Sequence, residues 1–501
     1  MSDGASVGKL DQLPAEMLEF TLLKTSGSLA PRLGRLSFPG RKSILTPAFI
    51  GNTSRGVIPH VSQDNFRSSA GVGGVYVALE DFIEKHLHKT PPILKYDVPE
   101  PLRRFITLPD DTLLVLGARR NPPIPSPHSN SNTEIRILTS VGFTTVSSEY
   151  YAAAARKLQP DIVVGLGDIA CGQEAISLKR KDKMSDRTEV WLRDIVAKQG
   201  TIEKGEKAWS IFAPILPIER DLQSWYLEHL LDDMVDKISG LAIYDAYLLH
   251  DLPDQLHHLP RLSFHVPASP HELLRHVSLG VDVFTVPFLA DATDAGIVLD
   301  FTFPPPARDT NTSARHSLGI DIWSGDHALS VTPLSQGCKC YACTNHHRAF
   351  LQHLLAAKEM LGWVLIQLHN HAMLSAFFAG IRSSIEAGTF DADAAAFEAY
   401  YEPTLPEKTG QGPRVRGYQF KSESHDPNRV KKNPRAFKKY SEDDILRLKA
   451  AHGQQPNDKP AMRDVIDDEA LLGLVEMEQS PVDADPAVQL NGLRLEDDKR
   501  G

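Results

Sequence analysis

Apolar and β-branched residues are concentrated in short runs that recur between residues 46 and 286. Each run is continuous rather than alternating, as in TLLVL at residues 112–116 and DIVVGL at residues 161–166. Continuous runs of this length are typical of strands buried on both faces, as in a parallel sheet covered by helices. The pattern predicts strands at residues 46–50, 74–79, 112–116, 161–166, 209–213, 240–244, 262–266 and 281–286.

The segments between these runs have helical spacing. Residues 148–158 place Tyr150, Ala154 and Leu158 on one helix face, and residues 186–198 and 220–238 repeat the pattern. After residues 262–266 the sequence PASPHELL predicts a helix start in which Ser269 is the N-cap, Pro270 is the first helical residue and Glu272 completes a capping box.

Strands and helices therefore alternate over about 250 residues, which predicts an α/β fold. About eight strands favour a (β/α)8 TIM barrel, with a doubly wound open sheet as the alternative. No glycine-rich phosphate loop follows any predicted strand, which disfavours a nucleotide-binding open sheet. We expect the barrel at residues 20–330, a further subdomain with closing helices at 331–402, and a charged tail at 403–501.

Two segments interrupt this alternation. Residues 119–133 are dense in Pro, Ser and Asn and are interpreted as a long surface loop. From about residue 402 the hydrophobic periodicity is lost, residues 408–439 are rich in Lys and Arg, and the balance turns acidic from Asp464. We expect this tail to be largely disordered, with one short helix at residues 443–451 capped by Ser441.

Composition narrows the class of protein. The 501 residues carry 54 Lys and Arg against 64 Asp and Glu, a net charge of −10, which disfavours a protein that coats nucleic acid with its whole surface. Four cysteines are too few for a disulfide scaffold. The first residues carry no basic and apolar leader, and the apolar run at residues 360–368 is too short to span a membrane. We therefore expect a soluble, cytoplasmic protein.

Three of the four cysteines, Cys338, Cys340 and Cys343, lie within six residues. Thiolates at this spacing can share one metal ion, and zinc requires a fourth ligand from elsewhere. The spacing alone leaves open which histidine supplies it, since His346, His347, His353, His369 and His371 all follow. Packing of three reduced cysteines and iron–sulfur ligation are the alternatives, and Cys171 is interpreted as inert. A Cys3His shell is closed, so one such zinc ion would be structural.

The block from Cys338 to Ile385 resembles the zinc-binding region of the tRNA-guanine transglycosylases, the queuine tRNA-ribosyltransferases. In that family C-x-C-x-x-C precedes an H-x-R-A-Y/F-L helix and a later HN pair. The resemblance implies Cys338, Cys340, Cys343 and His369 as zinc ligands. It extends over roughly residues 20–400, including TPAFIGNTSRGVIPHVSQDNF, DIVVGLGD, SGLAIY, GVDVF and IRSSIEAGTF, and it implies a (β/α)8 barrel.

Departures from the family pattern concern its catalytic residues. Catalytic members have a nucleophilic aspartate where this chain has Thr285, and a hydroxyl without an adjacent base is a poor substitute. The D-S-G-G-F-Q stretch has no counterpart within residues 102–120, and the Gly-Gly pair that approaches the base is reduced to Ser239-Gly240. Asp168 matches the aspartate that reads the purine, or is a loop-capping carboxylate.

The resemblance therefore implies a non-catalytic accessory subunit, with no catalytic residues of its own, that pairs as a heterodimer with a catalytic queuine tRNA-ribosyltransferase subunit. The complex would exchange guanine for queuine at the wobble position of tRNAs with GUN anticodons. Two alternatives are an active enzyme that uses Asp282, Asp291 or Asp294, and a zinc-dependent RNA-binding module. Basic segments that could contact tRNA phosphates are Arg103-Arg104, Arg119-Arg120, residues 179–183 and residues 408–439.

Overall fold

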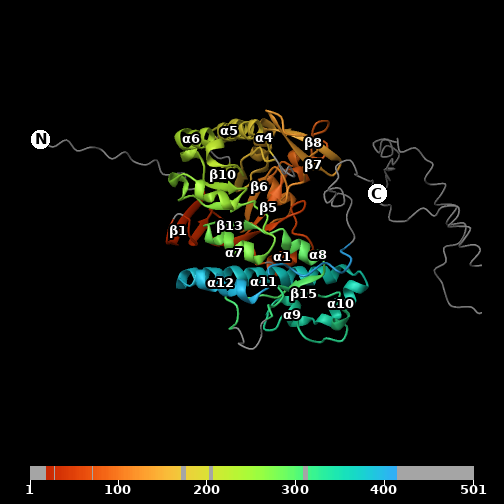
Figure 1. Cartoon of the computed structure of the whole chain (residues 1–501). Helices are drawn as coiled ribbons and strands as arrows, with labels where there is room; N and C mark the ends of the chain where they lie inside the picture. The colour runs from red at the N-terminus through yellow and green to blue at the C-terminus, as the bar shows by residue number, and fades with distance from the viewer. Residues whose placement is uncertain are drawn as a thin grey trace, which may run out of the picture. The chain divides into compact units, whose positions relative to one another are not determined.

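Eight parallel strands close into a barrel in the computed structural model, which describes residues 18–27, 29–69, 71–170, 176–201, 207–307 and 314–413 (Figure 1). The strands follow one another around the barrel in chain order, and β13 pairs with β4 to close it. All eight predicted strands are confirmed, with ends shifted by a few residues. They are β4 (Ala48–Asn52), β5 (Gly74–Ala78), β6 (Leu113–Gly117), β9 (Ile162–Val164), β10 (Ser210–Ile215), β11 (Gly240–Ile243), β12 (Arg261–Ser263) and β13 (Val283–Thr285).

The barrel interior is filled by alternate residues of these strands. Ile50, Val115 and Val164 belong to one buried cluster inside the barrel, whereas Leu114 and Val163 belong to the larger cluster that faces the helices. This two-sided burial explains why the strands appear in the sequence as continuous apolar runs.

An antiparallel sheet of β1 (Glu19–Thr25), β2 (Arg32–Ser37) and β3 (Ile44–Thr46) covers the amino-terminal end of the barrel. Leu36 and Phe38 join the interior cluster there. Arg32 Nε donates to Asp282 Oδ1 at 2.9 Å just before β13, and both side chains are buried. The sequence pattern did not predict this sheet, because β1 has no buried residue and β2 and β3 bury only alternate residues, so none of them forms a continuous apolar run.

Helices follow the strands, and the predicted helix at residues 148–158 is confirmed as α4 (Ser148–Leu158). Residues 220–238 are helical as expected, but not as one regular helix. Short 3₁₀ turns flank the α-helix Ser224–His229 and the π-helix Leu230–Met234. Acidic side chains gather at its carboxyl-terminal end, where the helix dipole disfavours them. The elements are α1 (Gln63–Ser69), α2 (Pro92–Lys95), α3 (Pro101–Phe105), α5 (Leu178–Gln199), η2 (Arg220–Leu222), α6 (Ser224–His229), the π-helix η3 (Leu230–Met234), η4 (Val235–Lys237) and α8 (Phe288–Asp294), with shorter turns η1 (Leu79–Asp81), η5 (Ala246–Asp251), η6 (Asp254–Leu256) and η7 (Gly325–His327).

Helix α7 (Pro270–Ser278) starts where the sequence predicts, with Ser269 as the N-cap and Pro270 in the first turn. The hydrogen bonds of the predicted capping box are not formed. The Ser269 side chain makes no capping hydrogen bond, and Glu272 Oε2 accepts a hydrogen bond from the backbone N–H of Ala268 at 2.6 Å instead of that of Ser269. The carboxylate therefore still satisfies one backbone donor at the helix start.

The segment at residues 119–133 is the predicted loop, and eight of its fifteen residues are exposed. Asn121 and Asn130 are buried, and the loop passes over the mouth of the barrel before the hairpin of β7 (Glu134–Thr139) and β8 (Gly142–Ser147). Loops at this end of a barrel commonly line a binding site.

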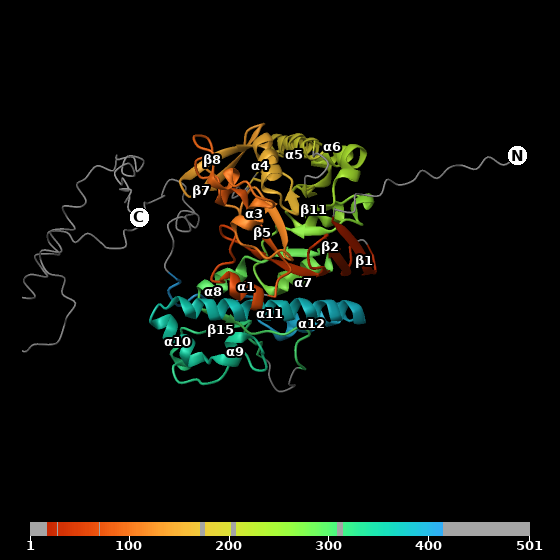
Figure 2. The ribbon, with the colours of Figure 1, turned by 180° about the vertical axis from the view of Figure 1, so that it is seen from behind.

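Beyond β13 the chain forms a layer on one side of the barrel. Figures 1 and 2 show α11 (Met360–Ala387) running between the barrel and the helices α9 (Tyr341–Asn345) and α10 (Arg348–Ala356). The hairpin of β14 (Ile297–Leu299) and β15 (Gly319–Asp321) and the closing helix α12 (Phe390–Tyr400) complete this layer. The boundaries at residues 330 and 402 remain predictions.

The helix that the resemblance implies after the cysteines is α10, and it does not continue into α11. The chain leaves α10 through Lys358, which has φ +58°, and the N–H groups of Lys358 and Glu359 donate to Leu355 and Leu354. This helix-ending pattern normally uses glycine, so the sequence did not signal it. The break reverses the chain, so that α11 packs against α10.

Helix α11 is long and apolar enough to cross a membrane by length and composition alone, yet 67% of its most apolar window is buried within the protein. It is thus the core helix of the layer described above. The short helix predicted at residues 443–451, Cys171 and most of the charged tail lie outside the described residues.

Candidate functional sites

The first site joins the three clustered cysteines to a histidine from α11. Cys338 and Cys340 precede α9, Cys343 lies within it, and His369 lies in the middle of α11. The His369 Nδ1 atom is 3.7 Å, 3.5 Å and 3.3 Å from the Sγ atoms of Cys338, Cys340 and Cys343 respectively. All four ligand atoms lie within 4.8 Å of one another.

Hydrogen bonds from α11 to β14 orient His369. Its Nε2 atom is 2.9 Å from the carbonyl oxygen of Leu299, and donation from Nε2 leaves the Nδ1 lone pair facing the sulfurs. Asn370 accepts from the Leu299 N–H at 2.9 Å and donates to the Ile297 carbonyl at 3.0 Å. The HN pair thus has two roles: the histidine faces the sulfurs, and the asparagine anchors the helix beside it.

These distances fit a tetrahedral ion. Sulfur and imidazole ligands at their usual distances from zinc are about 3.6 Å apart. The N–H of Cys343 also approaches Cys340 Sγ at 3.4 Å, which stabilises negative charge on that sulfur. Contacts with Cys340 and Cys343 lower the pKa of Cys338. The cluster can therefore hold one metal ion, and of the candidate histidines only His369 joins it within the described part of the chain.

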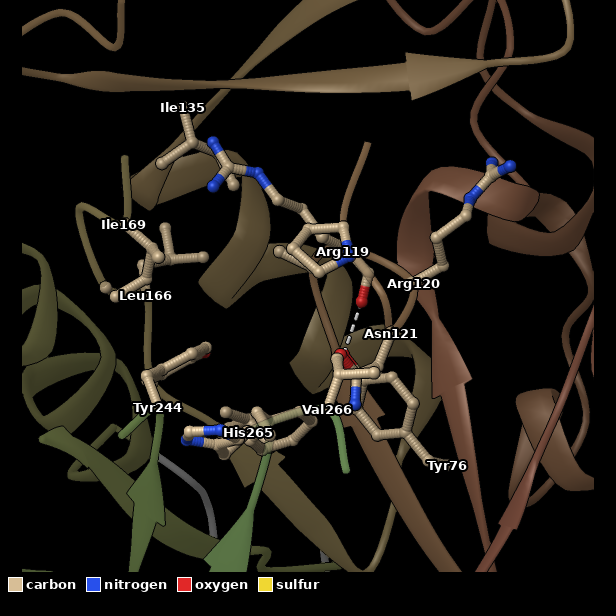
Figure 3. Close-up of a pocket in the computed structure, with 16 residues that line it drawn as sticks. Tyr76, Arg119, Arg120, Asn121, Ile135, Leu166, Ile169, Tyr244, His265 and Val266 are labelled. Carbon is tan, nitrogen blue, oxygen red and sulfur yellow. Dashed lines mark hydrogen bonds between the residues drawn. The ribbon is translucent and has the colours of Figure 1, made fainter. Parts of the chain in front are cut away.

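The second site is a cavity of about 380 Å³ at the carboxyl-terminal end of the barrel strands (Figure 3). Tyr76, Tyr244 and Phe264 contribute aromatic walls, and Phe264 lies 5.1 Å and 5.4 Å from the other two ring centroids. Arg119 and His265 contribute polar groups. In barrel enzymes this end carries the active site.

Thr285 at the end of β13 has no role in this cavity and does not line it. Its side chain is fully buried, and its Oγ1 accepts a hydrogen bond from Asn121 Nδ2 at 2.5 Å. The same hydroxyl donates to the carbonyl of Ser263 at 3.1 Å. A hydroxyl held in this way by an amide donor and a carbonyl acceptor has no base to activate it.

Asp168 is likewise enclosed by protein groups. Arg180 donates to both carboxylate oxygens at 2.5 Å and 2.6 Å, Arg187 donates to Oδ2 at 2.9 Å, and Asn130 donates to Oδ1 at 2.6 Å. Burial alone would raise the pKa of Asp168, but the hydrogen bonds from Arg180 and Asn130 lower it overall. In this arrangement the carboxylate anchors α5 and the 119–133 loop to the barrel instead of facing a purine base.

The other residues in the sequence hypothesis are separated from the cavity. Gly240 starts β11 at the amino-terminal end of the barrel, against the Phe212 ring, and neither Gly240 nor Ser239 lines the cavity. Asp282 is paired with Arg32 at that same end. Asp294 Oδ1 on α8 is 2.6 Å from His60 Nε2, and burial raises the pKa of Asp291 on the same helix. None of these residues lines the cavity.

The predicted basic patches differ in exposure. Arg103 is fully buried and its Nη2 is 2.8 Å from Asp161 Oδ2, so it is unavailable to a phosphate. Arg120 is paired with Glu80 and Asp81, and in Figure 3 its guanidinium points away from the cavity. Lys181 is paired with Glu219. Arg104, by contrast, has an exposed side chain that is 3.3 Å from Asp110.

The sequence did not predict the groups that hydrogen-bond to Thr285 and Asp168. Asn121 lies in a segment interpreted as a surface loop, and Arg180 was counted only as part of a basic patch. One signal was available, because Arg180 and Arg187 are seven residues apart and therefore share one face of a helix. A buried acceptor beneath that face could have been inferred from the pair.

Comparison with known proteins agrees with the resemblance seen in the sequence. A family model described as "Queuine tRNA-ribosyltransferase" matches residues 28–403. A Schizosaccharomyces pombe protein named queuine tRNA-ribosyltransferase accessory subunit 2 is 35% identical over 384 residues, covering 76% of this chain and 83% of the relative. Relatives of the same name from Anopheles gambiae and Xenopus tropicalis are 30% and 26% identical, covering 73% and 72% of this chain and 86% and 95% of their own lengths.

Proposed function

The chain belongs to the queuine tRNA-ribosyltransferase family, and we propose that within it the chain acts as a non-catalytic accessory subunit. It would support the exchange of guanine for queuine at the wobble position of tRNAs with GUN anticodons, with the chemistry performed by a catalytic subunit in a heterodimer. The name of the relatives, accessory subunit 2, supports this proposal.

The observation that carries the proposal is the hydrogen-bonded state of Thr285. At the position where catalytic members place their nucleophile, this chain has a hydroxyl bound by Asn121 and Ser263. Attack on a ribose carbon requires a group that can approach that carbon with a free electron pair. Neither the Thr285 hydroxyl nor the enclosed Asp168 carboxylate meets that requirement.

The alternative of an active enzyme with a displaced carboxylate is disfavoured by position. Asp282 lies at the opposite end of the barrel from the cavity, where Arg32 neutralises it. Asp291 and Asp294 lie on α8, and Asp294 is engaged by His60. A nucleophile must lie within van der Waals reach of the reacting carbon, and none of the three lines the cavity.

For the metal, we propose one structural zinc ion held by Cys338, Cys340, Cys343 and His369. A Cys3His donor set is typical of closed zinc sites, which stabilise a fold and leave no position for a substrate. The ion would fix the loop before α9 onto α11, where His369 lies among buried residues. The chain's own residues contribute the orientation of His369 through the Leu299 carbonyl.

The partner would dock on the zinc-binding subdomain. Near the cysteines the side chains of Leu329, Val331 and Tyr341 are 92%, 77% and 53% exposed. Large apolar side chains exposed to this degree favour contact with another protein. The RNA-binding alternative, a zinc module without a partner, gives no reason for them. We further propose that the complex works on tRNA in the cytoplasm.

The experiment is base exchange by each purified full-length subunit alone and by the two together. We expect labelled guanine to be exchanged in tRNA only when the catalytic subunit is present, and we expect the two chains to copurify. Leu329→Asp with Val331→Asp should weaken copurification, whereas Leu87→Asp, an exposed leucine on the barrel, should not. Exchange by this chain alone at the rate of the complex would exclude the accessory role.

A further inference from the structure

A second group of metal-ligand residues lies beside the barrel cavity, far in sequence from the cysteines. His265 follows β12, while Glu272 and His276 lie one turn apart on α7. One ligand atom from each of the three lies within 4.8 Å of the others. His265 also lines the cavity, so the group lies at its edge.

The three side chains face one another without hydrogen bonds between them. His265 Nε2 is 3.7 Å from Glu272 Oε1, which is too long for a hydrogen bond. His276 is fully buried, and neither of its ring nitrogens has a hydrogen-bond partner. Burying an imidazole without a partner is costly, so a ligand that accepts its lone pair would remove that cost.

The surrounding residues orient the group as they do around a metal ion. The Ala246 N–H donates to His265 Nδ1 at 3.4 Å, and Asp245 Oδ1 lies 3.4 Å from the same nitrogen. Asp245 is itself fixed by the Tyr247 N–H at 3.0 Å. In the tautomer that a metal ion would require, the proton lies on His265 Nδ1 and faces Asp245, and the Nε2 lone pair points toward Glu272. Carboxylate, histidine and metal commonly form such a triad.

The two carboxylate oxygens of Glu272 have different contacts. Its Oε2 accepts from the Ala268 N–H at the start of α7, and its Oε1 faces His265. The Tyr247 ring stands edge-on to both imidazoles, with centroids 5.6 Å from His265 and 5.4 Å from His276. The aromatic ring limits how far either imidazole can turn away.

We infer that His265, Glu272 and His276 bind a second metal ion, a divalent transition metal of the zinc class, with Asp245 as a positioning residue. Two imidazoles and one carboxylate suit such an ion, and nitrogen and oxygen ligands around zinc are about 3.4 Å apart, close to the separation of His265 and Glu272. Three protein ligands leave one coordination position for water or for a ligand.

The test is metal stoichiometry of the full-length chain with Zn²⁺ and Co²⁺ as probes. We expect two ions per chain, and the second Co²⁺ should add weak visible absorption without the intense sulfur-to-cobalt band of the cysteine site. His276→Asn and Glu272→Gln should each abolish the second equivalent, and Asp245→Asn should weaken it by roughly 10–100-fold. The exposed His258→Asn is the matched control and should retain both ions.

Two results would overturn the inference. One is a single bound ion per unmodified chain at saturating Zn²⁺, a measurement that does not depend on any variant folding. The other is a second ion that persists in His276→Asn and Glu272→Gln, which would locate it elsewhere. In either case the three side chains would form only a polar cluster.

Discussion

The amide of Asn121 donates a hydrogen bond to the hydroxyl of Thr285 across the mouth of the barrel, with Nδ2 and Oγ1 2.5 Å apart. Both side chains are buried, and Asn121 comes from the loop that passes over the strand ends. The contact therefore fastens the loop at the position where a nucleophile is expected in catalytic relatives. The residue that stands in place of the expected nucleophile therefore helps to hold the loop.

Replacing Thr285 tests this relationship. Thr285→Val leaves the Asn121 amide buried without its acceptor, so we expect a loss of about 1–3 kcal/mol in the free energy of unfolding. Thr285→Asp should also destabilise the chain, because the Ser263 carbonyl would face a carboxylate, and it should confer no base exchange on the isolated chain. Thr285→Ser keeps the hydroxyl and is the control. Denaturant unfolding and the guanine exchange assay measure both effects, and exchange by Thr285→Asp alone would contradict the account.

Asp168 should contribute to stability in a pH-dependent manner. Its pKa in the folded chain is lowered, so its contribution is present above its unfolded pKa and is lost as the pH falls through the folded value. Asp168→Asn removes a buried charge from two arginines and should cost about 3 kcal/mol at neutral pH. The difference between the two proteins should narrow below about pH 4. Unfolding measured across pH 3–7 would give this curve, and a constant difference would show that the ion pairs contribute little.

The cysteine site should couple metal content to folding. Cys340→Ser and His369→Asn each remove one of four ligands, so we expect loss of one metal equivalent and a lower melting temperature. His353→Asn, an exposed histidine on α10 outside the cluster, is the control and should keep the ion. Elemental analysis alongside thermal unfolding tests this. Iron in the purified protein, or a full metal content in Cys340→Ser, would refute the zinc assignment.

Substitutions at the adjacent residues Arg103 and Arg104 should have different effects on stability. Arg103→Met removes a buried partner of Asp161 and should destabilise the chain by roughly 2–4 kcal/mol. Arg104→Ala alters an exposed side chain and should leave the fold within about 0.5 kcal/mol of the original. If the surface around Arg104 contacts tRNA, the affinity of the complex should fall and its salt dependence should become shallower. Equal unfolding free energies for the two variants would contradict the burial of Arg103.

The sequence by itself determined the barrel and the cysteine cluster. Strands buried on both faces must be apolar at every position, so all eight appear as continuous runs that can be recognised locally. Cys338, Cys340 and Cys343 lie within one turn of chain, and their chemistry follows from that closeness. Features that depend only on neighbouring residues are thus visible before any fold is known.

Tertiary structure decided what those features mean at the two sites. His369 reaches the cysteines because the chain reverses at Lys358, a left-handed turn without the usual glycine. The sequence left open whether Asp168 reads a purine or caps a loop, and the contacts of Arg180 from α5 and Asn130 from the 119–133 loop favour the structural role. His265 and His276 meet only because α7 packs back beside β12. Each of these contacts joins elements whose relative positions are set by packing of the whole core, and no local pattern of residues carries that information.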